Sequence, residues 1–212
     1  MNGINDTINH ISDMYKFFNE KFEAKLPDDV VFTLIPNKST RGRYLGWFFR
    51  SRWNNNGVIL HEINLTPDFL NRTTDEVAET IIHEITHLKN FTEKITDCNK
   101  QQYHNKHFKT RAESFGLKVE RMKGKGYALT SLGERAKSIV EEYKTTILKG
   151  TNPFTIHRIP VETVPSKPKD TVSVAIKINL AEVVSNLSGE KLGTAVKNIL
   201  KEWVDKQAQE AV

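Results

Sequence analysis

The stretch His83-Glu84-Ile85-Thr86-His87 places two histidines four residues apart, with a glutamate directly after the first. On an α-helix, residues i and i+4 lie about 40° apart and one turn above each other, so both imidazoles can reach one metal ion. The glutamate lies at the flank of the pair, where it can hold a metal-bound water. Chance predicts only roughly 0.02 matches to this HExxH pattern in such a composition. The pattern therefore predicts a metal site.

The residues before this stretch predict the helix that it requires. Thr73 and Glu76 form the pattern T-x-x-E, a capping box that satisfies free N–H groups at the start of a helix. An apolar stripe with three- to four-residue spacing follows, which is typical of a helix face packed on a core. The stripe consists of Val77, Ile81, Ile82, Ile85 and Leu88.

A catalytic zinc site needs a third protein ligand and an open fourth position for water. The metzincin pattern, in which a histidine follows at a fixed spacing, is excluded because Asn90 and Glu93 occupy its positions. A glutamate on a later helix is one alternative, and Glu113 is the nearest candidate. His104 and His107 are the other candidates. The 16 residues between His87 and His104 are enough to bring a second helix back beside the first.

The segment His104-Asn105-Lys106-His107-Phe108 resembles one that follows HExxH in the SprT-like zinc metalloproteases, which include the Spartan and Wss-type proteases. Their pattern is His-Gly-x-x-Phe at the start of the next helix, and this chain has Asn105 at the glycine position. The stretch Phe108–Leu117, which ends in Gly-Leu, is also similar to the family's second helix. Upstream, 45–48 and 62–65 resemble the two strands before the metal helix in phage and mobile-element members. The resemblance covers about residues 40–150.

This resemblance implies an α+β, zincin-like metalloprotease domain in which a small antiparallel sheet packs on helices, followed by a C-terminal appendage. It implies one Zn²⁺ per chain on His83, His87 and His104, with Glu84 as the catalytic base. His107 stays an alternative ligand or a neighbour of the site, and Tyr103 is a candidate donor to the oxyanion. The implied activity is endopeptidase cleavage, with proteins bound to DNA as substrates. Many relatives carry a Cys-rich zinc ribbon, which this chain lacks.

The periodicity predicts further elements on both sides of the metal helix. An amphipathic helix is expected over 3–24 and strands over 30–35, 43–53 and 58–65, the last two joined at a favoured Asn-Gly hairpin turn. Downstream, a second helix is expected over 105–115, short strands near Val119 and 127–130, and a further helix over 131–148. These elements define a predicted catalytic domain over 1–150.

The composition changes after Gly150. Four prolines fall between 153 and 168, which predicts a linker or extended arm over 151–170. Residues 171–178 alternate like a strand, and 192–207 have the pattern of an amphipathic helix. We therefore expect a small strand–helix appendage over 171–212.

The net charge of +5 favours an anionic partner only weakly, but residues 89–125 hold ten Lys or Arg against four acids. Lys106, Lys109, Arg111 and Lys123 are the candidate nucleic-acid contacts in this basic rim. No apolar run approaches the ~18 residues of a membrane span. The lone Cys98 cannot form an internal disulfide, and we expect a cytoplasmic protein without membrane partners.

A rival hypothesis is a non-catalytic module that binds nucleic acid or a partner protein and contains a structural zinc. A structural zinc usually fills all four positions with protein ligands and needs no base. Glu84 therefore favours the peptidase.

Overall fold

The computed structural model describes residues 3–36 and 44–159, together with five single residues between 194 and 205. The chain divides into two compact units, Met1–Val161 and Glu162–Val212. Every helix and strand whose ends are described lies in the first unit. The predicted strand over 171–178 lies outside the described residues. Of the predicted helix over 192–207, the five described residues are helical and exposed.

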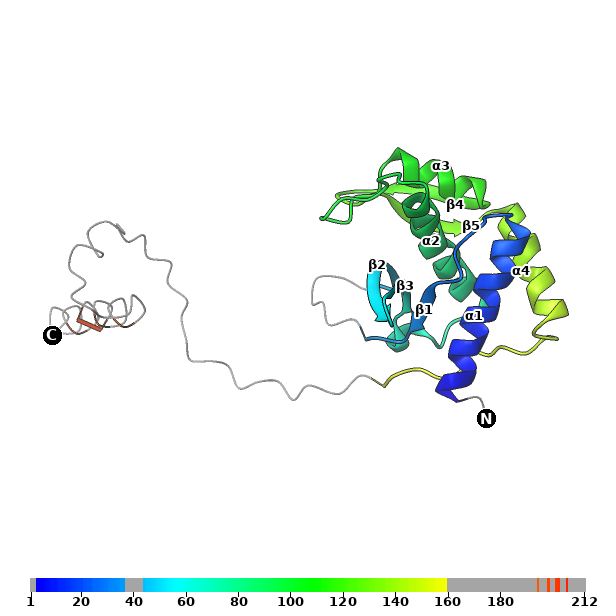
Figure 1. The fold of residues 1–212 in the computed structure, drawn as a ribbon, viewed down its shortest axis with the longest axis horizontal. Coiled ribbons are helices and arrows are strands. Elements are labelled where there is room, and N and C mark those ends of the chain that lie inside the picture. The colour runs from blue at the N-terminus through cyan, green and yellow to red at the C-terminus, as the bar shows by residue number, and fades with distance from the viewer. Residues whose placement is uncertain are drawn as a thin grey trace. The chain divides into compact units, whose positions relative to one another are not determined.

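Helix α2 (Thr74–Thr92) carries the HExxH stretch and runs through the middle of the first unit (Figure 1). Its capping box forms as predicted. The Thr73 N–H donates to Glu76 Oε2 at 2.9 Å, and the Glu76 N–H donates to Thr73 Oγ1 at 3.3 Å. The apolar stripe of α2 is fully buried, which fixes the rotation of the helix and therefore the direction of its histidines.

A three-stranded sheet packs against α2 on one side, in the order β1-β3-β2. Strands β2 (Gly46–Asn55) and β3 (Val58–Leu65) form the expected antiparallel hairpin, and its turn residues Asn56 and Gly57 both have positive φ. Strand β1 (Val30–Thr33) pairs in parallel with β3. The sheet is therefore mixed and not wholly antiparallel as expected, because β1 lies beside the second strand of the hairpin instead of the first.

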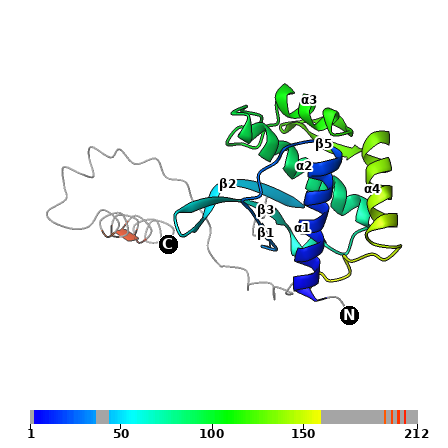
Figure 2. The same ribbon diagram turned by 45° about the vertical axis from the view of Figure 1, so that its right-hand side comes forward.

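Helices α1 (Ile4–Lys21) and α4 (Glu134–Thr146) lie next to each other and cover another side of α2 (Figure 2). Aromatic rings join them: Phe17 on α1 contacts Tyr143 on α4 edge to face, with ring centroids 5.2 Å apart. Tyr143 is fully buried, and so are Met14 and Phe18 of α1. This cluster forms the part of the core that holds α2 from behind.

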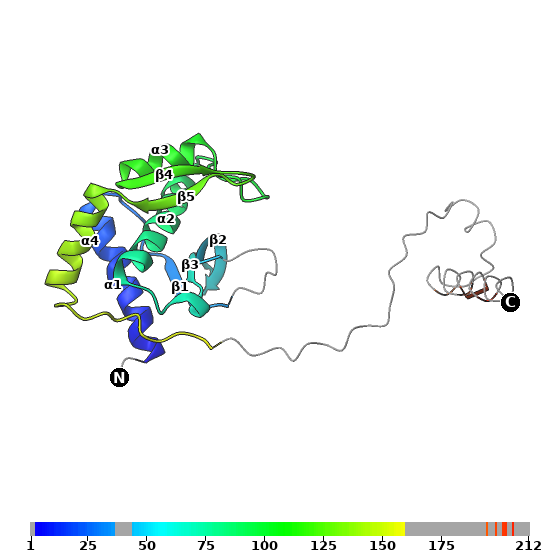
Figure 3. The ribbon, with the colours of Figure 1, turned by 180° about the vertical axis from the view of Figure 1, so that it is seen from behind.

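Helix α3 (Lys106–Ser114) and the hairpin of β4 (Leu117–Met122) and β5 (Gly126–Leu132) lie on the far side of α2 from the three-stranded sheet (Figure 3). Asn105 caps α3, since its side-chain oxygen accepts from the N–H groups of His107 and Phe108. A short 3-10 helix, η1 (Pro67–Phe69), connects β3 to α2. The mixed α+β architecture predicted from the sequence is present.

The chain after α4 continues to pack on the first unit. Phe154 is 1% exposed, the Asn152 side-chain amide donates to the Arg72 carbonyl at 3.2 Å, and the Arg158 N–H donates to the Pro67 carbonyl at 3.0 Å. Residues 151–159 therefore belong with the packed domain, beyond the boundary expected at 150. Within the described part of the chain, no helix is both long and apolar enough to cross a membrane.

Candidate metal centre

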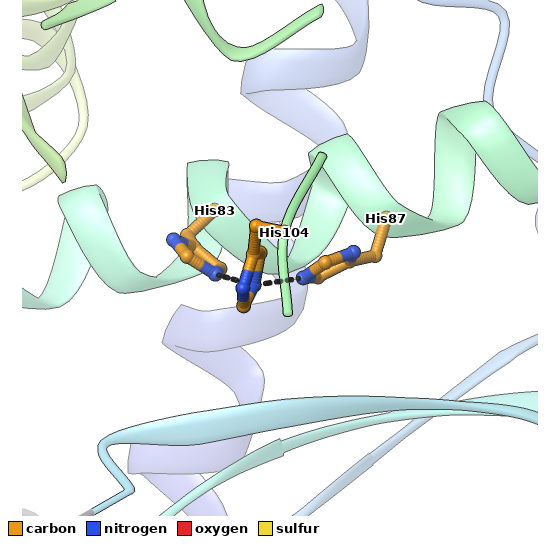
Figure 4. Close-up of side chains that lie close together, drawn as sticks. All are labelled: His83, His87 and His104. Atoms are coloured by element: carbon orange, nitrogen blue, oxygen red, sulfur yellow. Dashed lines mark hydrogen bonds between the residues drawn. The ribbon is translucent and has the colours of Figure 1, made fainter. Parts of the chain in front are cut away.

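Three histidine side chains converge between α2 and the loop that precedes α3 (Figure 4). His104 Nε2 lies 3.3 Å from His83 Nε2 and 3.1 Å from His87 Nε2. The two histidines of the HExxH stretch come from one face of α2, as the i and i+4 spacing requires. The structure thus brings together the three residues that the sequence and the family resemblance pointed to.

Backbone contacts on both sides hold His104 in place. Its N–H donates to the Lys125 carbonyl at 2.9 Å, and its carbonyl accepts from the Tyr127 N–H at 3.0 Å. It also forms an isolated antiparallel bridge with Cys98. Gly126 has φ +67°, and a Cβ there would lie 2.1 Å from the His104 carbonyl oxygen. This close approach therefore requires glycine.

The start of α3 is tied to the same loop. The Asn105 N–H donates to the Asp97 carbonyl at 2.9 Å, and the Asn105 side-chain amide donates to the Thr96 carbonyl at 2.8 Å. The two ends of the segment 97–104 are therefore closed onto each other, with His104 at one of them.

The distances of 3.3 and 3.1 Å from His104 Nε2 to the other two Nε2 atoms fit a tetrahedral metal ion. Ligand nitrogens at about 2.0–2.1 Å from zinc in tetrahedral geometry lie about 3.3 Å apart. A neutral ring nitrogen has either one N–H or one lone pair, so a hydrogen bond gives His104 Nε2 one partner and leaves its second close nitrogen unexplained. Three imidazole nitrogens within 4.8 Å of one another are instead a donor set that can hold a cation.

Asp97 fixes the orientation of His87, and no sequence pattern predicted this role. The Nδ1 atom of His87 lies 3.0 Å from Asp97 Oδ2, and Asn90 Nδ2 donates to the same oxygen at 2.9 Å. With the proton on Nδ1, the His87 Nε2 lone pair faces the centre. Burial lowers the pKa of His87, but the hydrogen bond and charge of Asp97 outweigh burial and raise it.

The other two histidines are held in the neutral form that binds metal. Burial, followed by the charges of His87 and His104, lowers the pKa of His83 well below its ordinary value. Burial and the charge of His87 lower the pKa of His104 to about 4. Neutral imidazoles at neutral pH have the free lone pairs that ligation requires.

Phe108 packs against the three histidines together. Its ring centroid lies 4.6 Å from that of His83, 4.7 Å from that of His87 and 4.5 Å from that of His104. The ring is fully buried and shields the imidazoles from solvent on that side. One signal in the sequence marks it, the Phe at the fifth position of the segment starting at His104.

Glu84 is buried beside the first residues of β2. Its carboxyl accepts a hydrogen bond from the Phe48 backbone N–H, and burial, partly offset by the charge of His87, raises its pKa to about 7. A Cβ on Gly46 would lie 2.7 Å from the Asn64 carbonyl oxygen and 3.4 Å from Glu84 Oε1. Gly46 therefore lets the strand approach the glutamate closely.

The other two metal-ligand candidates, His107 and Glu113, are not members of the converging group. His107 is exposed on the first turn of α3, and Glu113 is exposed and paired with Lys109. Tyr103 Oη accepts a hydrogen bond from Arg121 Nη2 at 3.0 Å. The structure therefore groups His104, and neither His107 nor Glu113, with the histidines of α2.

The four candidate nucleic-acid contacts differ in their partners. Lys109 is paired with Glu113, and Arg111 is paired with Glu93. Lys106 and Lys123 are exposed, and no partner for either is found among the described residues. Their positive charge is therefore less compensated than that of the other two.

Comparison with known proteins agrees with this geometry. The sequence model of the SprT-like family matches residues 11–127. This match covers most of α1, the three-stranded sheet, α2, α3 and β4, and it contains all three converging histidines. No match was found to a curated protein or to a solved structure. The family has a metalloprotease-like domain and depends on metal, and this chain belongs to the SprT-like family.

Proposed function

We propose that the chain is a zinc-dependent endopeptidase. The observation that carries the proposal is the convergence of three histidine side chains next to the buried Glu84. His83 and His87 come from α2, and His104 comes from the loop before α3. Three imidazoles without a fourth protein ligand are the donor set of catalytic zinc. Within the described residues the metal-binding group contains three members, so a position stays open for a water molecule.

Glu84 is the residue that moves the proton. When bound, zinc lowers the pKa of a water molecule to about 7 and polarises the peptide carbonyl. A Glu84 carboxylate oxygen would accept the water's proton as the water oxygen attacks the peptide carbonyl. The same carboxyl would then donate this proton to the leaving amine. Burial raises the pKa of Glu84 to about 7 in the metal-free site, and the charge of a bound zinc ion would lower it toward the carboxylate that accepts the proton.

The substrate lies as an extended strand along the free edge of β2. Strand β2 is at the end of the order β1-β3-β2, so its outer edge has no partner strand among the described residues. The same strand passes Glu84 at Gly46 and Phe48. A peptide that adds to this edge is therefore led to the catalytic glutamate by main-chain hydrogen bonds.

We further infer that the protein substrates are bound to DNA. The support is the basic rim over 89–125, in which Lys106 and Lys123 are exposed and have no ion-pair partner among the described residues. Contacts to phosphate would hold the peptidase beside a DNA-bound target and raise its local concentration. Tyr103 stays a candidate oxyanion donor, since its hydroxyl proton is not used in the contact with Arg121.

The deciding experiment combines metal analysis with cleavage of a short unstructured peptide. Glu84→Gln should keep one zinc per chain and lose cleavage, because an amide cannot accept the water's proton. Glu113→Gln, an exposed glutamate outside the metal group, is the matched control and should keep both. A Glu84→Gln protein that still cleaves would refute the mechanism. A native protein that binds zinc without any cleavage would favour the structural-zinc module.

A further inference from the structure

A side-chain contact on the outer nitrogen of His83 links the metal group to the β4–β5 hairpin. Thr130, on β5, has its hydroxyl oxygen 3.3 Å from His83 Nδ1. The same hydroxyl donates to Glu79 Oε1 at 2.9 Å. Glu79 lies four residues before His83 on α2, so it faces the same side of the helix one turn earlier. The three groups form a hydrogen-bonded chain from the Glu79 carboxylate through the Thr130 hydroxyl to the His83 imidazole.

The positions of the protons in this hydrogen-bonded chain follow from the donors and acceptors available. A threonine hydroxyl has one proton and two lone pairs, whereas an ionised carboxylate can only accept. The hydroxyl proton therefore points to Glu79, and the oxygen accepts from Nδ1–H of His83. That tautomer leaves the lone pair on His83 Nε2, which is the atom 3.3 Å from His104 Nε2. The arrangement selects the nitrogen that faces the metal position.

Arg72 supports the ionised form of Glu79. Burial raises the pKa of Glu79, while the hydrogen bond from Thr130 and the charge of Arg72 oppose that rise. Arg72 is held by two contacts to α2, since its Nη1 donates to the Glu76 carbonyl at 3.1 Å and to Thr80 Oγ1 at 3.0 Å. The charge beside Glu79 is therefore fixed in position.

We propose that Glu79 and Thr130 are positioning residues that set the tautomer and ring orientation of His83, and so strengthen its ligation. The inference rests on the proposed metal-ligand role of His83. The support of His83 differs in kind from that of His87, whose Nδ1 contacts the Asp97 carboxylate directly at 3.0 Å. Here a hydroxyl from a separate hairpin stands between the carboxylate and the ring.

The first test measures zinc affinity by competition with a chelator. Thr130→Val has nearly the same shape but lacks the hydroxyl, and it should bind zinc about 10- to 100-fold more weakly, the usual effect of removing such a partner. Thr130→Ser keeps the hydroxyl, and its zinc affinity should stay within about threefold of the native value. Ser131→Ala removes an exposed hydroxyl from the next position on β5 and is the control. Unchanged affinity in Thr130→Val would overturn the proposal.

The second test reads the tautomer of His83 without metal. In the apoprotein, ¹⁵N NMR of the imidazoles should show His83 protonated on Nδ1, and the population on Nε2 should rise in Thr130→Val. Glu79→Gln, which keeps an acceptor but removes the charge, should shift the tautomer in the same direction and weaken zinc binding several-fold. This variant decides the matter if Thr130→Val does not fold.

The two tests separate the failure of this proposal from failure of the proposed function. If the native protein binds no zinc but His83 is protonated on Nδ1 through Thr130, the peptidase assignment fails and the positioning contact stands. If zinc binds and Glu79→Gln changes neither the affinity nor the tautomer, the positioning role is refuted while the peptidase assignment is unaffected.

Discussion

Asp97 Oδ2 lies 3.0 Å from His87 Nδ1 and turns the opposite nitrogen of that ring toward the other two histidines. Asn90, which is 1% exposed, donates to the same oxygen and keeps the carboxylate in place. This contact gives the first prediction. Asp97→Ala should weaken zinc binding about 10- to 100-fold, because the ring no longer has the acceptor that fixes its tautomer. Chelator competition measures the effect, and Asp13→Asn, an exposed acid on α1, should have none.

The choice of third ligand can be tested by a pair of single substitutions. His104→Ala should abolish stoichiometric zinc binding, measured by elemental analysis of the purified protein, because only two nitrogens remain at the centre. His107→Ala should keep one zinc per chain, since His107 is exposed on α3 and outside the metal group. The reverse result would assign the third ligand to His107.

Two glycines at one hairpin separate backbone strain from steric clash. Gly124 and Gly126 have φ of +76° and +67°, but only a Cβ at 126 meets other atoms within 4 Å, the nearest being the His104 carbonyl oxygen at 2.1 Å. Gly124→Ala should cost about 1–2 kcal/mol of unfolding free energy from positive φ alone and keep the native zinc affinity. Gly126→Ala should cost more and should also abolish zinc binding, because His104 is displaced. Equal zinc affinity in the two variants would contradict this explanation of how His104 is held.

The capping box of α2 predicts a pH-dependent contribution to stability. Hydrogen bonds from the backbone and side chain of Thr73 lower the pKa of Glu76. A group whose folded pKa is lowered stabilises the fold above its unfolded pKa, and this effect disappears as the pH falls through the folded value. Thr73→Ala should cost about 1 kcal/mol at neutral pH. Glu76→Gln should be less stable than the native protein at neutral pH but nearly equal to it at strongly acidic pH, in urea unfolding followed by circular dichroism. A difference that grows on acidification would contradict the sign.

DNA binding through the rim should depend unequally on its four candidate residues. Reversal of Lys106 or Lys123 to Glu should weaken binding and reduce the slope of log K against log salt by about one for each phosphate that is no longer neutralised. Lys109→Glu should have less effect, because Lys109 is already paired with Glu113. Zinc content and cleavage of a short free peptide should stay near native. Absence of any DNA affinity at ~50 mM salt, where the electrostatic contribution is strong, would remove DNA from the proposed function.

Local sequence signals were enough for the metal helix and the hairpin before it. The capping box at Thr73, the apolar stripe of α2 and the Asn56-Gly57 turn act through neighbouring residues, and each is present as predicted. His104 could be predicted as the third histidine of the group because it belongs to a short segment with a family pattern. In these cases the information lies within a few residues of the feature.

The features that could not be predicted from the sequence depend on contacts between distant segments. Thr130 reaches His83 only because the β4–β5 hairpin folds over α2, and no local pattern marks its hydroxyl. The parallel pairing of β1 depends on which hairpin strand it meets. Phe154 follows Pro153 in a stretch that has the composition of a linker, yet it is buried on the domain. Propensity alone does not report such tertiary burial.

The closed segment 97–104 holds His104 in a fixed position and at the same time has an exposed tip that is free to vary. Its ends are fixed by the Cys98–His104 bridge and by Asn105, whereas Lys100 and Gln101 at its tip are exposed. Exposed loop tips tolerate insertion when the backbone at their base stays hydrogen-bonded. Evolution or a protein engineer can therefore lengthen or replace this tip, while His104 at its base keeps its place.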